Sequence, residues 1–194
     1  MYTLTYITSN PEKVNEAKEI LPGLVWQKMH LAEIQSLDSE EIITAKMMQA
    51  VAEFPDADER VLVVEDVSLN FHNCQGLPGP LVKWFLKTIG ADGLYTMAKA
   101  FNAYGASVVL TVGVKAPGGK PMFFKGEVEG NIVPPRGKAE KHFGFDPIFA
   151  PKGMSKTYGE MTPEEKNAVS HRGLALRKVR EYLENKLSWQ FQAS

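Results

Sequence analysis

Residues 61–69 read Val-Leu-Val-Val-Glu-Asp-Val-Ser-Leu, and this stretch decides the fold that we predict for the chain. Its four consecutive aliphatic residues are typical of a strand buried on both faces, as in an α/β core. Glu65 and Asp66 follow, where we expect that strand to end. Since ligands bind beyond the carboxyl ends of strands in open α/β sheets, the acid pair is a candidate site for a metal ion or a water.

A stiff turn follows the strand, with the sequence Gly76-Leu77-Pro78-Gly79-Pro80. An amphipathic helix is predicted from Leu81, and Lys83 lies near its start. Acids, turn and cation therefore fall within about one strand–helix unit. The same pattern also fits an exposed acid pair and a solvated lysine, so both interpretations stay open at this point.

The whole chain has the composition of a globular protein. It has 194 residues, of which 44% are hydrophobic and 23% are charged, and its net charge is −1. The near-neutral charge argues against nucleic-acid binding, and the single cysteine, Cys74, excludes an internal disulfide. No apolar run approaches a membrane span, and we expect a cytoplasmic protein. We predict one domain over residues 1–186 and a tail over residues 187–194.

The N-terminal segment predicts a strand over residues 4–8, followed by a helix with Asn10 as its N-cap and Pro11 at its first position. A polar loop, a helix N-terminus and an early Lys13 together make a possible phosphate cradle. Ordinary helix capping is the alternative. The next expected elements are a short strand over 24–30 and a helix capped by Asp38 or Ser39.

Two further charged residues lie in this region. Glu33 is expected in a loop, where a solvated acid is the usual interpretation. Lys46 lies near the edge of the apolar stripe of its helix, so a snorkelling lysine is the alternative to a functional one.

Downstream, a helix is predicted over residues 93–102, and two strands over 106–116 and 121–133. The turn at residues 117–120 joins these strands as a hairpin. Long antiparallel strands beside shorter strand–helix units favour an elongated mixed sheet with two lobes.

The last third of the chain concentrates polar motifs. Phe143-Gly144-Phe145-Asp146-Pro147 places two aromatic residues and an acid on a bent loop. Thr162 and Glu165 have the pattern of a capping box around Pro163 at N1, and Lys166 follows. Ser170-His171-Arg172 leads into a final amphipathic helix. The tail from Leu187 carries no interpretable pattern.

These residues suit a triphosphate ligand. A triphosphate needs cations, backbone N–H groups and a divalent metal, and Mg²⁺ prefers a few carboxylates plus substrate phosphates. The cations near turns or helix ends are Lys13, Lys46, Lys83, Lys166 and Arg172, and the acids are Glu33, Glu65 and Asp66. Metal-assisted phosphoryl or nucleotidyl chemistry is consistent with this set, but spacing alone does not establish it.

Five blocks in chain order resemble the inosine triphosphate pyrophosphatase family. They are Thr8-Ser9-Asn10-Pro11-Glu12-Lys13, Val64-Glu65-Asp66, Gly76-Leu77-Pro78-Gly79-Pro80 continuing to Lys83-Trp84-Phe85, Phe143-Gly144-Phe145-Asp146-Pro147-Ile148-Phe149, and Glu165-Lys166-Asn167 with Ser170-His171-Arg172. The resemblance runs from about Thr3 to Leu183. The block around Lys83 and the block around His171 are together highly specific.

That resemblance implies an α/β fold with an elongated central mixed β-sheet flanked by helices, two lobes with a substrate cleft between them, and a homodimer. It implies hydrolysis of ITP, dITP and XTP to the monophosphate and pyrophosphate with Mg²⁺, for which Mn²⁺ could substitute. A pyrophosphatase for another modified nucleotide, or a nucleotide-binding module without turnover, are the alternatives.

The resemblance also implies roles for residues at matching positions. Glu33 and Asp66 would bind the metal, and Asp66 would accept the proton of the attacking water. Glu65 would support the site from the opposite face of the strand. Phosphates would be bound by Thr8, Ser9, Asn10, Pro11, Glu12, Lys13, Lys46 and Lys83. The nucleoside would be surrounded by Phe143, Gly144, Phe145, Asp146, Lys166, His171 and Arg172.

One position departs from the family pattern. Relatives usually carry Thr or Ser directly after the acid pair, whereas this chain has Val67. A hydroxyl contact to the substrate is then missing, and we expect the affinity or the substrate range to differ.

Overall fold

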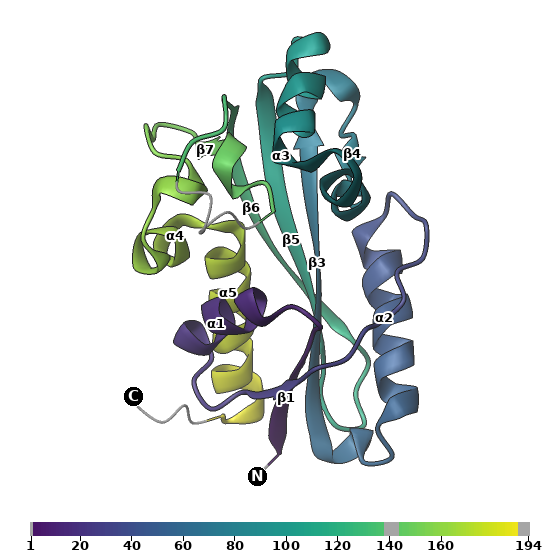
Figure 1. Cartoon of the computed structure of the whole chain (residues 1–194). Coiled ribbons are helices and arrows are strands. Elements are labelled where there is room, and N and C mark those ends of the chain that lie inside the picture. The colour runs from purple at the N-terminus through teal and green to yellow at the C-terminus, as the bar shows by residue number, and fades with distance from the viewer. Residues whose placement is uncertain (1, 138–143, 190–194) are drawn as a thin grey trace. The chain divides into compact units, whose positions relative to one another are not determined.

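The computed structural model describes residues 2–137 and 144–189. Within them, seven strands form one mixed sheet in the order β2-β1-β3-β5-β6-β7, with β4 paired to β3, and five α-helices accompany it (Figure 1). The α/β class predicted from the sequence is confirmed. The chain divides into two compact units, which are described separately: residues 1–66, 110–126 and 172–194, and residues 67–109 and 127–171.

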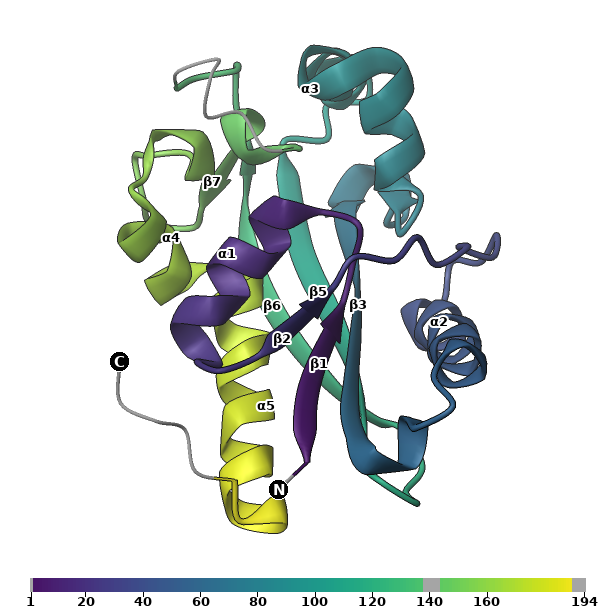
Figure 2. The same cartoon turned by 60° about the horizontal axis from the view of Figure 1, so that its bottom comes forward.

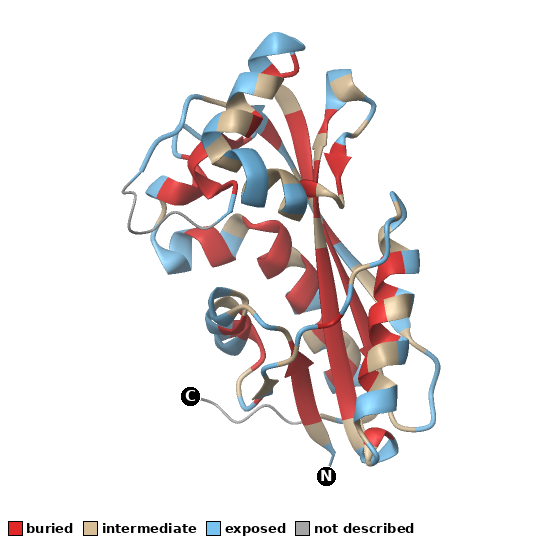
Figure 3. Ribbon diagram, turned by 45° about the vertical axis from the view of Figure 1, so that its right-hand side comes forward, coloured by how far each residue is buried: buried red, intermediate tan, exposed pale blue. Residues whose placement is uncertain are grey.

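The first unit is built on parallel strands. β1 (Thr3–Ile7) pairs with both β2 (Val25–Gln27) and β3 (Arg60–Phe71), and Tyr6 lies opposite Val63 in the register. β2 is shorter than the strand expected over residues 24–30. β1 and the first part of β3 are buried along most of their length, as expected for strands covered on both faces (Figure 3).

Helices cover both faces of the sheet in this unit. α2 (Ser39–Glu53) lies on one face, and α1 (Pro11–Ile20) and α5 (His171–Leu187) lie side by side on the other (Figures 1 and 2). The predicted N-caps are confirmed: Asn10 accepts a hydrogen bond from the Glu12 amide at 3.0 Å, and Asp38 accepts one from the Glu40 amide at 2.8 Å.

Successive side chains of β3 point alternately toward α2 on one face of the sheet and toward α1 and α5 on the other. Leu62 and Val64 pack with Ile43 and Met47 of α2. Since successive strand residues point to opposite faces, Asp66 joins this side and Glu65 the other. The sequence prediction that the acid pair ends the strand is wrong. β3 continues to Phe71, and its residues Leu69 and Asn70 pair antiparallel with β4 (Pro78–Gly79).

The second unit has its own apolar core, centred on Leu69, Phe71, Leu94, Ile148 and Phe149. α3 spans Val82–Ala100 and consists of two helical segments separated at Gly90, whose φ of 67° favours glycine, so the prediction of a helix on either side of this glycine is confirmed. This unit also contains α4 (Pro163–Val169) and β7 (Phe149–Pro151), which pairs antiparallel with β6 (Met122–Ile132). The predicted capping box of Thr162 and Glu165 is confirmed.

The predicted pair of long strands is confirmed as β5 (Gly105–Lys115) and β6 (Met122–Ile132). The turn between them contains Gly118 at φ 63°. Short 3₁₀ helices occupy Ala57–Glu59, His72–Cys74, Asp146–Ile148 and Tyr158–Glu160. Among the described helices, none is both long enough and apolar enough to cross a membrane.

Candidate active site

Asp66 lies at the centre of a buried acid–base cluster on the α2 side of β3. The Lys46 ammonium, on α2, lies 2.7 Å from Asp66 Oδ1, 2.9 Å from Glu33 Oε1 and 3.1 Å from the Glu65 carbonyl oxygen. Lys46 is only 5% exposed, so the snorkelling alternative is wrong. The structure therefore brings Glu33, Lys46 and Asp66 together.

The second oxygen of this carboxylate has a different environment. Asp66 Oδ2 is buried and has no hydrogen-bond partner within residues 2–137 and 144–189. A buried carboxylate oxygen is costly to leave unsatisfied, which indicates a place for an exogenous ligand. Burial raises the pKa of the Asp66 carboxyl even though Lys46 opposes the shift. Burial opposes the charge on Lys46, but Asp66 and Glu33 outweigh it and raise the pKa of its ammonium.

Glu65 lies at the centre of a second cluster, on the α1 and α5 side. Its carboxylate accepts hydrogen bonds from Arg172 at 2.8 and 3.2 Å, from Lys13 at 2.9 Å and from the Tyr6 hydroxyl. Arg172 also binds Glu16 at 2.5 Å. Burial alone would raise the pKa of the Glu65 carboxyl, but Arg172 and Lys13 outweigh burial and hold the pKa far below its usual range.

The two clusters explain how this strand accommodates adjacent acids. Each carboxylate faces one helical layer and meets lysine from that layer, Lys46 on α2 and Lys13 on α1. Buried charges are tolerated when they are paired and hydrogen-bonded.

The loop into α1 is the predicted phosphate cradle. Thr8 Oγ1 accepts a hydrogen bond from the Asn10 amide at 3.1 Å, and the Thr8 carbonyl accepts one from the Trp26 indole at 2.9 Å. Asn10 caps the helix and Pro11 occupies its first turn. Ser9, Pro11 and Glu12 are exposed, whereas Lys13 is partly buried.

A separate group of predicted residues lies in the second unit. The Lys166 ammonium is 2.5 Å from Asp146 Oδ2, and both residues are buried. The His171 ring lies 6.0 Å from the Phe145 ring and 5.8 Å from the Tyr158 ring, measured between centroids. This unit therefore brings together a buried ion pair and a cluster of aromatic rings.

Other predicted residues of this unit lie nearby in sequence. Gly144 has a φ of 59°, which favours glycine at this bend. Lys83 is in the first turn of α3, with its ammonium 5.6 Å from the Trp84 ring centroid. Val67 packs against the apolar core of the unit. Phe143 lies outside the described residues.

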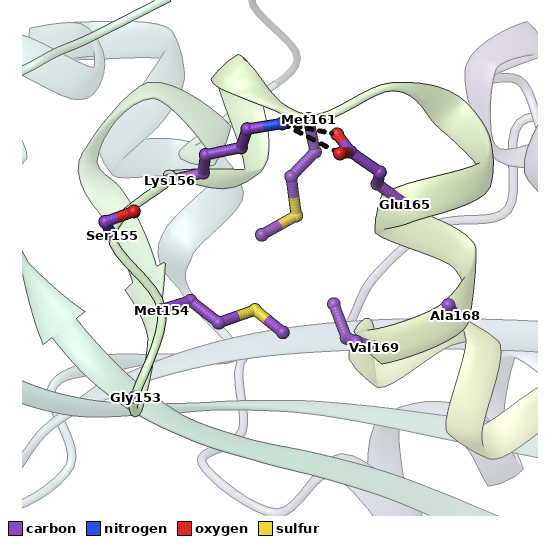
Figure 4. A pocket seen from close by; sticks show the side chains of 8 residues that line it. All are labelled: Gly153, Met154, Ser155, Lys156, Met161, Glu165, Ala168 and Val169. Atoms are coloured by element: carbon purple, nitrogen blue, oxygen red, sulfur yellow. Dashed lines mark hydrogen bonds and ion pairs between the residues drawn. The ribbon is translucent and has the colours of Figure 1, made fainter.

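A pocket of about 490 Å³ also lies in the second unit (Figure 4). Met154, Met161 and Val169 give it apolar walls, and the ion pair of Lys156 and Glu165 borders it. The residues that line it include no residue predicted for the site.

Sequence reasoning missed Tyr6 and Glu16. A tyrosine inside a buried strand needs a partner for its hydroxyl, which was a usable signal for Tyr6. Glu16 lies one helical turn after Lys13, so both share a face of α1. The partner of Tyr6 is Glu65 and that of Glu16 is Arg172; both partners are far away in the sequence, and the fold brings them close.

The described residues contain no group of three or more His, Cys, Asp or Glu side chains placed to hold a metal ion. The candidate metal ligands are thus a pair, Glu33 and Asp66, bridged by Lys46. Mg²⁺ commonly uses only one or two protein carboxylates, with phosphates and waters completing its shell.

Fold and site together define an α/β protein in which two adjacent acids of the central strand pair with lysines from the flanking helices. Residues 4–182 match the model of the Ham1 family, and the chain belongs to that family. An inosine triphosphate pyrophosphatase of Schizosaccharomyces pombe is 40% identical over 189 residues, which cover 95% of this chain and 97% of the relative.

Solved structures agree on the fold. The Ham1 protein of Staphylococcus aureus has a TM-score of 0.75 at 22% identity, over 94% of this chain and 99% of that one. A nucleoside-triphosphatase, or dITP/XTP pyrophosphatase, of Mycobacterium abscessus has a TM-score of 0.66 at 27% identity, over 91% and 98% of the two chains.

Proposed function

We propose that this chain hydrolyses the deaminated purine nucleotides ITP, dITP and XTP to the nucleoside monophosphate and pyrophosphate. The observation that carries the proposal is the buried cluster of Asp66, Lys46 and Glu33, with one Asp66 oxygen left without a partner among the described residues. The names of the similar proteins from Schizosaccharomyces pombe and Mycobacterium abscessus support the same substrates.

In this proposal Asp66 accepts the proton of the attacking water. The water oxygen bonds to the α-phosphorus, the bond from that phosphorus to the α,β-bridging oxygen breaks, and pyrophosphate leaves in one piece. A raised pKa suits this role, because a general base works best when its pKa approaches the working pH.

Glu33 and Asp66 would hold Mg²⁺, or Mn²⁺ in its place. The fit rests on the unpartnered Asp66 oxygen and on the carboxylate chemistry of the pair. When bound, the ion would supply positive charge to neutralise the phosphates. Lys46 lies between the two acids, so it would exchange part of its carboxylate contacts for a phosphate oxygen.

The other predicted residues divide between the phosphates and the nucleoside of the substrate. The Thr8–Lys13 segment, Lys46 and Lys83 would bind phosphates through cations and helix N–H groups. The nucleoside would meet Phe143, Gly144, Phe145, Asp146, Lys166, His171 and Arg172. Arg172 has each of its three nitrogens on a carboxylate, so a base contact would use its two remaining N–H groups.

A nucleotide-binding module without turnover is the second candidate, and Val67 favours it. A valine packed against an apolar core cannot supply the hydroxyl contact that Thr or Ser would make. Retention of Asp66, Glu33 and the lysines favours turnover. A panel of ITP, XTP, dITP and the common triphosphates, incubated with Mg²⁺ and assayed for pyrophosphate, separates the candidates. A binder would retain nucleotide and release nothing.

We further propose a homodimer, as the family resemblance implies, and a location in the cytoplasm, as expected from the sequence. Light scattering of the purified protein should give twice the chain mass of 21.5 kDa. A single-chain mass at micromolar concentration would contradict the dimer.

A further inference from the structure

The buried hydroxyl of Tyr6 has no part in the reaction proposed above. Tyr6 is fully buried in β1, opposite Val63 of β3, so its side chain points to the α1 and α5 side of the sheet. There its hydroxyl donates a hydrogen bond to Oε2 of Glu65. Glu65 is in turn the carboxylate that holds Lys13.

Each of the two oxygens of the Glu65 carboxylate contacts two donor groups. Among the described residues, Oε1 receives Lys13 and one Arg172 nitrogen, whereas Oε2 receives Tyr6 and another Arg172 nitrogen. Removing the Tyr6 donor would leave Oε2 one hydrogen bond short. The negative charge of Glu65 would then be less dispersed, and its attraction for Lys13 would increase.

We propose that Tyr6 is a positioning residue for Lys13. The Tyr6 hydroxyl fixes the Glu65 carboxylate that Lys13 contacts and weakens the attraction of this carboxylate for Lys13, so that Lys13 can move to contact a phosphate. The phosphate role of Lys13 rests on the proposed function. Lys13 is suited to such a transfer, because 18% of its side chain is exposed while that of Glu65 is 1% exposed.

Two properties keep Tyr6 in this role at neutral pH. Burial and the neighbouring Glu65 charge raise the pKa of the Tyr6 hydroxyl, so it remains a protonated donor. Its ring is fully buried, and Tyr6→Phe removes the hydroxyl while keeping the shape of the ring.

The test uses Tyr6→Phe and, as a matched control, Tyr182→Phe. Tyr182 lies on α5 and packs against the Phe124 ring, so this control removes a phenol oxygen from the same unit. Calorimetric titration with tripolyphosphate in the absence of metal measures phosphate affinity without turnover. We expect Tyr6→Phe to bind about three- to tenfold more weakly, the scale of a hydrogen bond to a charged group that is partly transmitted to Lys13.

Steady-state kinetics with ITP and Mg²⁺ give the second readout. We expect KM to rise by a similar factor while kcat stays within about twofold, and Tyr182→Phe to match the parent in both assays. A purely structural Tyr6 would lower Tm alone, and unchanged tripolyphosphate affinity would therefore overturn the proposal.

A double-mutant cycle with Lys13→Met tests whether Tyr6 acts through Lys13. In the Lys13→Met background, Tyr6→Phe should change tripolyphosphate affinity no further, whereas additive losses would overturn the proposal. Failure of the parent to bind tripolyphosphate would also overturn it. Absence of ITP hydrolysis with normal tripolyphosphate binding would instead contradict the proposed function. The double-mutant cycle in tripolyphosphate affinity would still test whether Tyr6 acts through Lys13.

Discussion

At the scale of single residues, Asp66 carries the chemistry of this account. Asp66→Asn keeps the shape of the side chain but removes the group that accepts a proton and binds a cation. We expect kcat to fall by about 10²- to 10⁴-fold at saturating Mg²⁺. Asp58→Asn is the control, since Asp58 is an exposed acid that pairs with Lys115. Near-parental turnover of Asp66→Asn would show that the reaction is centred elsewhere.

Glu65 should govern stability and its dependence on pH. Its folded-state pKa is depressed, so its stabilising contribution is complete above the ordinary glutamate value of 4.5 and is lost as the pH falls below that value toward the folded-state pKa. Glu65→Gln removes an anionic partner of Arg172 in a buried site and leaves it paired with Glu16, which we expect to lower the free energy of unfolding by about 3–5 kcal/mol at pH 7.

Urea unfolding of the parent and Glu65→Gln at pH 7 and near pH 3 measures this difference. The difference in the free energy of unfolding between the parent and Glu65→Gln should be smaller at the lower pH, because the other groups titrate alike in both proteins. An equal difference in the free energy of unfolding at both pH values would contradict a depressed pKa of Glu65 in the folded protein.

At the scale of elements, the N-terminus of α1 has both a structural and a binding role. Asn10→Ala removes a cap and should cost about 1 kcal/mol of stability. It should also raise KM for ITP, because the capped turn presents the phosphate-binding N–H groups. Asp38→Ala removes the corresponding cap of α2 and should cost similar stability with no change in KM. Equal KM values for both variants would contradict a cradle at α1.

The sequence allowed the elements to be predicted wherever the signal is local. The caps at Asn10, Asp38 and Thr162 were predictable because each motif spans only a few residues. The extent of β3 was not, since its continuation past Asp66 depends on pairing with β4. The contacts of Glu65 with Tyr6 and Arg172 could not be predicted for the same reason, because these residues lie 59 and 107 residues away in the sequence.

At the scale of the whole molecule, we expect the protein to discriminate between nucleotides by their base. Hypoxanthine presents a keto oxygen where adenine presents an amino group, and donors such as Arg172 favour the acceptor. Unpaired polar groups cost about 1–3 kcal/mol each, so two mismatches give about a hundredfold or larger preference for ITP over ATP in kcat/KM. Guanine shares the keto group, so it would be excluded by the shape of the site around its 2-amino group.

Arg172→Ala should lower the ITP/ATP ratio, and the ratio cancels any loss of folded protein. Glu65→Gln is the control, because it weakens the same ion pair but keeps the arginine donors. An Arg172→Ala ratio equal to that of the parent would exclude base recognition by this residue.

In the proposed reaction, water attacks the α-phosphorus of the nucleotide. Hydrolysis of ITP in H₂¹⁸O, followed by mass spectrometry of the products, tests this most directly. The account predicts one ¹⁸O atom in inosine monophosphate and unlabelled pyrophosphate. Label in pyrophosphate, or release of orthophosphate with the diphosphate, would contradict it.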